Sequence, residues 1–153
     1  MISTGDMAPD FTLPRTDGRD LTLSALRPGA VALYFYPRDD TPGCTREALE
    51  FTALARDFED AGVAVLGISR DSIAKHGKFT EKHGLGVELL SDADGAVCAA
   101  YGVWVEKTLY GRTSMGIQRA TFLIAGDGRV ARVWPKVRVA GHAAEVLQAA
   151  RAI

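Results

Sequence analysis

Cysteine is scarce in this chain, and that scarcity excludes one class of protein. Only two of the 153 residues are cysteines, whereas small secreted domains held together by disulfides usually carry more. No run of apolar residues approaches the roughly 20 that a membrane span needs. The first residues also lack the basic segment and the apolar segment that together make a signal peptide. We therefore expect a cytosolic protein, without a membrane span, whose two thiols are reduced at rest.

An excess of charge of one sign is missing as well. The chain has 18 basic and 19 acidic side chains and a net charge of −1, which argues against a nucleic-acid-binding protein. Hydrophobic residues make up 47% of the sequence and charged residues 24%, a composition typical of folded globular proteins and not of disordered ones. The length fits one domain, so we expect residues 1–153 to form a single domain.

Apolar runs alternate with amphipathic segments along the chain. The patterns predict strands at residues 10–13, 20–23, 30–36, 63–69, 88–90, 121–125 and 130–134. They predict helices at residues 45–60, 72–83, 94–101 and 143–152. Strands that alternate with helices and end in a hairpin indicate an α/β fold with a mixed sheet flanked by helices.

Cys44 stands out because it lies where the predicted strand 30–36 gives way to the predicted helix 45–60. In the first turn of a helix the unpaired backbone N–H groups and the positive end of the helix dipole favour a thiolate. At 100° per residue, Cys44 also shares one stripe with the apolar residues of that helix. We therefore expect a partly buried, reactive thiol at the base of a small pocket.

The residues before Cys44 suit such a pocket. Pro37 fixes φ at the start of the turn, and Pro42 stands where the first turn of a helix accepts proline. Gly43 lets the backbone approach a small ligand closely. Thr41 is placed to cap the helix with its hydroxyl and to hydrogen-bond a thiolate or a bound oxygen. This arrangement predicts a site for a small, oxygen-rich substrate.

The motif Pro37-x-x-x-Thr41-x-x-Cys44 resembles the active-site signature of the peroxiredoxins. The longer string from Tyr34 to Glu47 is similar to the bacterioferritin comigratory protein branch, and the similarity covers nearly the whole chain. The resemblance implies a thioredoxin-like fold. It also implies a thiol-dependent peroxidase that reduces hydrogen peroxide and organic hydroperoxides and needs no cofactor.

The resemblance also assigns roles to single residues. It makes Cys44 the peroxidatic cysteine, with Thr41 orienting the peroxide and Pro37 shielding the thiolate from water. Arg119 matches the active-site arginine of the family, which would stabilise the thiolate and the charge on the leaving oxygen. For Glu47 two interpretations stay open, a partner that holds an arginine or a charge that complements the helix dipole. The expected substrate-binding residues are Gly43, Thr41 and Arg119.

The chain departs from the branch in its second cysteine. Many members resolve the sulfenic acid with a cysteine at a position that is Leu49 or Thr80 here. Cys98 could resolve it after local unfolding, or it could be a small buried apolar residue, which is the interpretation we favour. We therefore expect a one-cysteine mechanism in which an external thiol such as thioredoxin, glutaredoxin or glutathione is the reductant. The resemblance favours a monomer over a dimer.

Other functions compete with the peroxidase. A thioredoxin-like protein of this kind could be a non-enzymatic redox sensor or a binding module. A disulfide reductase is less well supported, because Thr41 stands where a Cys-x-x-Cys pair would place a second sulfur.

The histidines invite a metal site, which we do not expect. His76 and His83 lie about 10.5 Å apart along one predicted helix, too far to share an ion. We expect these two and His142 to be solvated. Asp39 and Asp40 are expected at the rim of the pocket.

Overall fold

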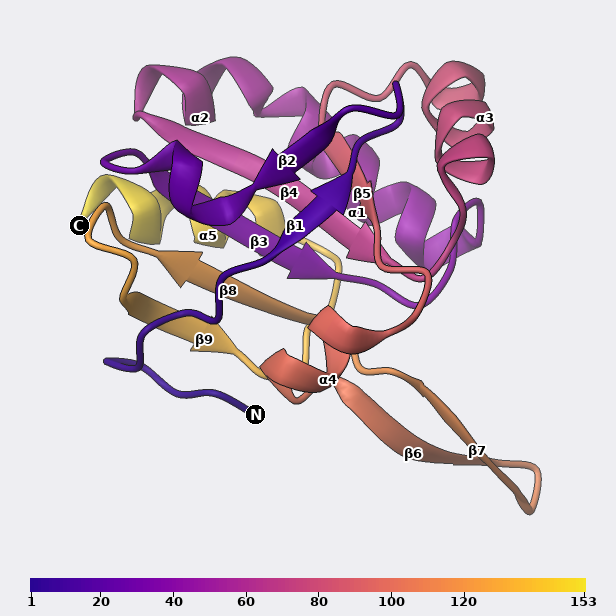
Figure 1. Ribbon diagram of the computed structural model, residues 1–153. Coiled ribbons are helices and arrows are strands. Elements are labelled where there is room, and N and C mark those ends of the chain that lie inside the picture. Colours follow the sequence, from indigo (N-terminus) through magenta and orange to yellow (C-terminus); the bar gives the residue numbers. More distant parts are fainter.

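The computed structural model describes all 153 residues and has a five-stranded sheet at its centre (Figure 1). The strand order is β5 (Glu88–Ser91), β4 (Val63–Ser69), β3 (Ala30–Phe35), β8 (Ala120–Ile124) and β9 (Val130–Trp134). Strands β3, β4 and β5 run parallel to one another, whereas β8 runs antiparallel to both β3 and β9. The predicted mixed sheet flanked by helices is therefore confirmed.

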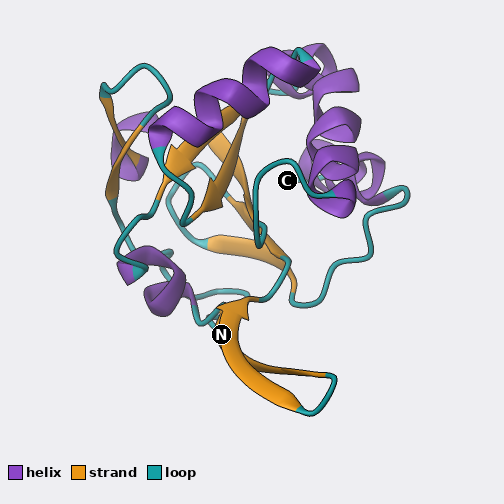
Figure 2. Ribbon diagram, turned by 90° about the vertical axis from the view of Figure 1, so that its right-hand side faces the viewer, coloured by secondary structure: helices purple, strands orange, loops and turns teal.

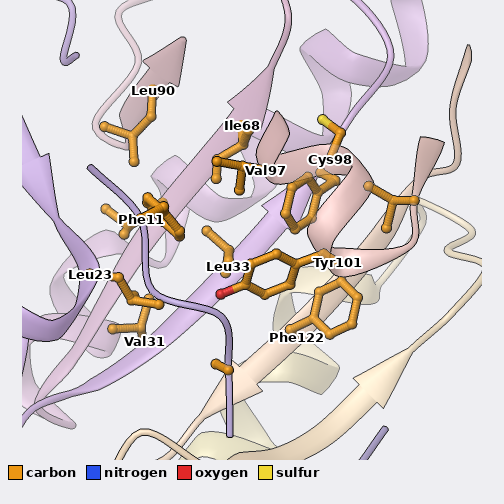
Figure 3. Packing of buried hydrophobic residues seen from close by; sticks show 14 of the residues in the cluster. Phe11, Leu23, Val31, Leu33, Ile68, Leu90, Val97, Cys98, Tyr101 and Phe122 are labelled. Carbon is orange, nitrogen blue, oxygen red and sulfur yellow. The ribbon is translucent and has the colours of Figure 1, made fainter. Parts of the chain in front are cut away.

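Two hydrophobic clusters lie on the two faces of this sheet, because successive side chains of a strand point to opposite faces. Val31, Leu33 and Phe35 of β3 belong to the first cluster, and Ala32 and Tyr34 belong to the second. The first cluster, part of which Figure 3 shows, also contains side chains from β1 (Thr12–Pro14), β2 (Asp20–Thr22), the 3-10 helix η1 (Leu23–Leu26) and α4 (Ala96–Tyr101). The second contains side chains from α1 (Pro42–Ala53), α2 (Ala55–Asp60), α3 (Ile73–His83) and α5 (His142–Arg151).

The predicted helix 45–60 is two helices, α1 and α2, and it begins earlier than expected. Pro42 takes the first helical position, after Thr41 as N-cap, as proline's missing N–H allows. The break falls at Leu54, whose N–H donates to the carbonyl of Phe51. Just before it, the Thr52 hydroxyl donates to the Ala48 carbonyl at 2.7 Å and accepts the Gly86 N–H at 3.0 Å. A threonine that bonds back to its own helix bends it.

The other predicted helices are found, with ends shifted by at most two residues. Helix α3 is capped by the Ser72 hydroxyl, which accepts the Lys75 N–H, and it ends at Gly84 with φ +62°. That left-handed conformation is one that glycine adopts without a steric penalty. None of the helices is both long enough and apolar enough to cross a membrane.

A hairpin of β6 (Trp104–Leu109) and β7 (Arg112–Ile117) was not predicted. Figures 1 and 2 show it extending away from the rest of the molecule. Most of its residues are exposed, so it lacks the apolar alternation by which half-buried strands are recognised. In the structure Tyr110 and Gly111 form its turn, with φ of +52° and +73°, as in the tight turns of hairpins. The glycine at position 111 is the sequence signal that could have indicated this turn.

Candidate active site

Cys44 is the third residue of α1 and is 2% exposed. Its sulfur accepts a hydrogen bond from Nη2 of Arg119 at 3.2 Å. The predicted position at a helix N-terminus is therefore confirmed. The predicted pocket directly over the sulfur is not found, since no cavity of the structure is lined by Cys44. The sulfur is more enclosed than expected because the Arg119 guanidinium covers it.

Arg119 reaches this sulfur through the pairing of the sheet. It immediately precedes β8, and Ala120 of β8 pairs with Phe35 at the end of β3. Arg119 therefore lies beside the point where the chain leaves β3 for the loop that leads to Cys44. A Cβ on Gly43 would lie 3.2 Å from Nη2 of Arg119. We expected Gly43 to let a small ligand approach the backbone closely. In this structure it is the Arg119 guanidinium that approaches the backbone at Gly43.

Glu47 lies one turn of α1 beyond Cys44 and holds the arginine. Its Oε1 accepts a hydrogen bond from Nη1 of Arg119 at 2.6 Å, and its side chain is 1% exposed. Of the two open interpretations of Glu47, the geometry therefore confirms the one in which Glu47 holds an arginine. One guanidinium bridges the carboxyl group and the sulfur, which fixes its orientation.

The charges of this group influence one another. Burial raises the pKa of Glu47 to about 7, although Arg119 opposes the shift. Oε2 of Glu47 has no hydrogen-bond partner, so nothing further stabilises the carboxylate. Burial alone would lower the pKa of Arg119, but the Glu47 carboxylate and the Cys44 sulfur outweigh it and raise that pKa. The guanidinium therefore carries its positive charge beside Cys44 at all physiological pH values.

Thr41 is the N-cap residue of α1, but its hydroxyl does not cap the helix. The hydroxyl donates to the carbonyl oxygen of Arg38 at 2.9 Å. The predicted side-chain cap is therefore wrong: the hydroxyl oxygen accepts no N–H of the helix, because its hydrogen bond to Arg38 directs it toward the preceding loop. No hydrogen bond joins Thr41 to Cys44 in this structure, and the hydroxyl oxygen keeps its lone pairs free to accept one.

Pro37 follows β3 and lines a cavity of about 400 Å³. The other side chains around this cavity include Trp104, Lys107 and Met115 of the β6–β7 hairpin. Burial lowers the pKa of Lys107, and the positive charge of Arg119 lowers it further, while Cys44 opposes the shift. The Lys107 ammonium therefore experiences the charges of the Cys44 site.

Cys98 lies in α4 and is fully buried in the first cluster (Figure 3). Its own N–H donates to Oδ2 of Asp92 at 2.8 Å. Burial raises the pKa of its thiol well above the usual range, and hydrogen bonding and charge from Asp92 add to the shift. Cys44 belongs to the second cluster, so the two cysteines pack against opposite faces of the sheet. The structure does not bring Cys98 to Cys44.

The expectation of solvated histidines is wrong for two of the three. His76 is fully buried and bonded to Asp39, which is itself buried and not at a rim. His142 is buried too, and burial lowers its pKa to about 4. His83 is partly exposed and bonded to Asp40. A signal for His76 was present, because it precedes the buried Phe79 by three positions on one face of α3.

Comparison with known proteins supports the identification that the motif suggested. Residues 4–133 match the AhpC/TSA family. A putative peroxiredoxin bcp of Coxiella burnetii is 51% identical over 146 residues, covering 95% of this chain and 97% of that protein. The peroxiredoxin Bcp of Xanthomonas campestris is 46% identical over 143 residues, covering 94% and 89% of the two chains.

Solved structures agree with these relatives. The bacterioferritin comigratory protein of Xanthomonas campestris, described for its alkyl peroxide reduction activity, superposes with a TM-score of 0.89 at 45% identity, covering 93% of this chain and 90% of that one. A mutant of Xylella fastidiosa PrxQ superposes with a TM-score of 0.94 at 40% identity, covering 99% and 97%. This chain therefore belongs to the AhpC/TSA family, as a peroxiredoxin enzyme with a thioredoxin-like fold, of the bacterioferritin comigratory protein branch.

Proposed function

We propose that this peroxiredoxin reduces hydroperoxides with Cys44 as the peroxidatic residue and that an external thiol completes its cycle. The observation that supports this assignment most directly is the 3.2 Å hydrogen bond from Arg119 to the Cys44 sulfur at the N-terminus of α1. A fixed positive charge and a helix N-terminus both favour the thiolate, which is the nucleophilic form. Cys98 is also the third residue of its helix, but the nearby Asp92 carboxyl group accepts its N–H, and no guanidinium bonds its sulfur.

In the first step the Cys44 thiolate attacks the terminal oxygen of the hydroperoxide. A sulfur–oxygen bond forms and the oxygen–oxygen bond breaks, which oxidises the thiolate to a sulfenic acid. The departing alkoxide or hydroxide takes up a proton and leaves as an alcohol or water. Arg119 stabilises the negative charge that builds on the departing oxygen.

The neighbouring residues complete the site. The Thr41 hydroxyl donates its hydrogen bond to the Arg38 carbonyl oxygen, so its own oxygen is available to accept a hydrogen bond from the peroxide and orient it. Pro37 shields the thiolate from water, and Gly43 leaves the space in which Arg119 and the substrate meet. We assign Cys44, Thr41, Arg119 and Pro37 as catalytic residues, and Thr41, Arg119 and Gly43 as the substrate-binding residues.

Organic hydroperoxides join hydrogen peroxide as proposed substrates. The cavity of about 400 Å³ beside Pro37 is walled partly by Trp104 and Met115, and apolar walls suit the organic group of such a substrate. The alkyl peroxide reduction activity of the Xanthomonas campestris relative supports the same substrate class.

The sulfenic acid is then reduced without a second cysteine of this chain. One molecule of an external thiol attacks the sulfenic sulfur, releasing water and forming a mixed disulfide, and a second thiol displaces Cys44 from that disulfide. Thioredoxin, glutaredoxin and glutathione are the proposed reductants. We further propose a cytoplasmic monomer in which residues 1–153 act as one domain.

The test is peroxide consumption by the wild type, Cys44→Ser and Cys98→Ser with each of the three reductants. We expect turnover to be lost in Cys44→Ser and nearly unchanged in Cys98→Ser, the matched control. Turnover by Cys44→Ser would contradict the assignment. A wild type that is oxidised once but is not recycled by any of the reductants would favour the redox-sensor alternative.

A mass spectrum after one equivalent of peroxide, without reductant, tests the one-cysteine mechanism. We expect one added oxygen on the peptide that contains Cys44. An intramolecular disulfide between Cys44 and Cys98 would overturn the mechanism, because it would make Cys98 the resolving residue.

A further inference from the structure

A buried polar network joins the loop before Cys44 to α3. At its centre is His76, which has no exposed surface. Its Nδ1 lies 2.6 Å from Oδ2 of Asp39, and its Nε2 lies 3.0 Å from the carbonyl oxygen of Leu90. The hydroxyl of Tyr36 donates to the other oxygen of Asp39 at 2.5 Å. The peroxidase chemistry described above uses none of these contacts.

Counting donors and acceptors indicates where the protons of this network lie. The Leu90 carbonyl can only accept, so Nε2 of His76 carries a proton. A second proton lies between Nδ1 and the Asp39 carboxyl group. Both ring nitrogens of His76 are therefore hydrogen-bonded, and the ring is held between Asp39 of the loop and Leu90 of β5. The hydrogen bond from Tyr36 holds the other oxygen of Asp39.

Asp39 lies within the loop that forms the proposed site. It follows Arg38, whose carbonyl accepts the Thr41 hydroxyl. Its backbone N–H donates to Oδ2 of Asp71 at 2.9 Å. The next residue, Asp40, has φ +60°, a left-handed conformation that costs free energy for residues other than glycine. The surrounding structure must therefore hold this loop in place.

Helix α3 supplies most of that support. His76 binds the side chain of Asp39, while Lys82 and His83 bind the side chain of Asp40 at 2.8 and 2.7 Å. The Asp40 contacts are exposed, and exposed ion pairs contribute little. The Asp39 contact is fully buried, and removing one partner of a buried pair is strongly destabilising. His76 is the member of α3 on which the loop conformation depends most.

We propose that His76 is a positioning residue of the peroxidase, which through its buried hydrogen bond fixes Asp39 and so places Pro37 and Thr41 around the Cys44 sulfur. The inference rests on the proposed roles of those three residues. Its consequence is selective: without His76, peroxide attack slows because the orienting groups are displaced, whereas the reactivity of the thiolate itself, which depends on Arg119 and the helix, changes little.

The test compares two reactions of Cys44 in the double variant Asp39→Ala/His76→Leu. Removing both partners avoids leaving one buried polar side chain without its partner, so this variant is expected to fold. We expect the second-order rate of Cys44 oxidation by peroxide to fall about 10-fold, since small displacements of orienting groups cost rate. Alkylation of Cys44 by iodoacetamide, which needs no oriented peroxide, should stay within about 2-fold. The matched control is His142→Leu, a buried histidine that does not contact the loop, and its oxidation rate should be unchanged.

Nitrogen NMR of the wild type at pH 7 gives a second, independent readout. Nε2 of His76 should carry a proton, because it lies 3.0 Å from the Leu90 carbonyl oxygen, which can only accept. An Nε2 of His76 without a proton, an unchanged oxidation rate in the folded double variant, or an equal loss of oxidation and alkylation would each overturn the inference. If Cys44→Ser is inactive while the double variant is oxidised at the wild-type rate, only the role of His76 fails and the proposed function stands.

Discussion

The two cysteines of this chain are equally buried and differ in their charged neighbours. Cys44 is 2% exposed and Cys98 is 0% exposed. The sulfur of Cys44 accepts a hydrogen bond from a guanidinium, whereas burial raises the pKa of the Cys98 thiol and the neighbouring Asp92 carboxyl group adds to that shift. The comparison teaches that burial alone does not decide whether a thiol can react. The sign of the neighbouring charge matters as well, since a cation favours the thiolate and a carboxylate opposes it.

Their positions in the fold differ as well. Each is the third residue of its helix, but Cys44 belongs to a helix of 12 residues in the second cluster and Cys98 to a helix of six residues in the first cluster. A disulfide requires Cα atoms within about 7 Å. Because the two residues pack against opposite faces of the central sheet, bringing them together would require one helix to leave its cluster.

The largest expected effect comes from removing the charge that distinguishes Cys44. Arg119→Ala should slow the oxidation of Cys44 by peroxide about 100-fold, because the variant loses a donor that stabilises charge in the transition state. Stopped-flow measurement of the second-order rate constant checks this.

Arg119→Lys is the matched control for that variant. It keeps the positive charge but cannot bridge the Cys44 sulfur and Glu47 with two nitrogens of one planar group. Its rate should fall between the wild type and Arg119→Ala. If Arg119→Ala reacts at the wild-type rate, the difference between the two cysteines does not come from the guanidinium.

A smaller effect is expected from Glu47, the carboxyl group behind Arg119. Its pKa in the folded protein is about 7, above the unfolded value of 4.5, so between these values the folded state binds more protons than the unfolded state. The free energy of unfolding of the wild type should therefore fall by about 2 kcal/mol, relative to Glu47→Gln, as the pH rises from 5 to 7. Urea unfolding of both proteins across this range measures the difference. Parallel pH profiles would show that Glu47 does not titrate in this window.

The smallest effect is expected at the other cysteine. Cys98→Ser places a hydroxyl in an apolar cluster and should lower the free energy of unfolding by about 1 kcal/mol. Peroxide turnover should stay at the wild-type level. Urea unfolding and a turnover assay on the same sample check both statements, and a loss of turnover in the folded variant would place Cys98 in the catalytic cycle after all.

Most of the fold could be predicted because its core elements follow regular patterns. The strand Val63–Ser69 has the predicted bounds, and α3 differs from the predicted helix 72–83 only at its first residue, since Ser72 is its N-cap. The β6–β7 hairpin was missed since its exposed side chains carry no burial pattern. The division of one predicted helix at Leu54 was missed since it depends on Thr52 and on Gly86, which is distant in the sequence.

The sequence by itself determined the position of Cys44, because a buried strand, a proline-bounded turn and an amphipathic helix are local features encoded within about 30 residues. Only the tertiary structure decided which charges surround it. The pairing of β3 with β8 brings Arg119 to the sulfur from 75 residues away, and the packing of α3 buries His76 against Asp39. Contacts between residues so far apart depend on how the sheet and helices pack, and no local pattern of residues specifies them.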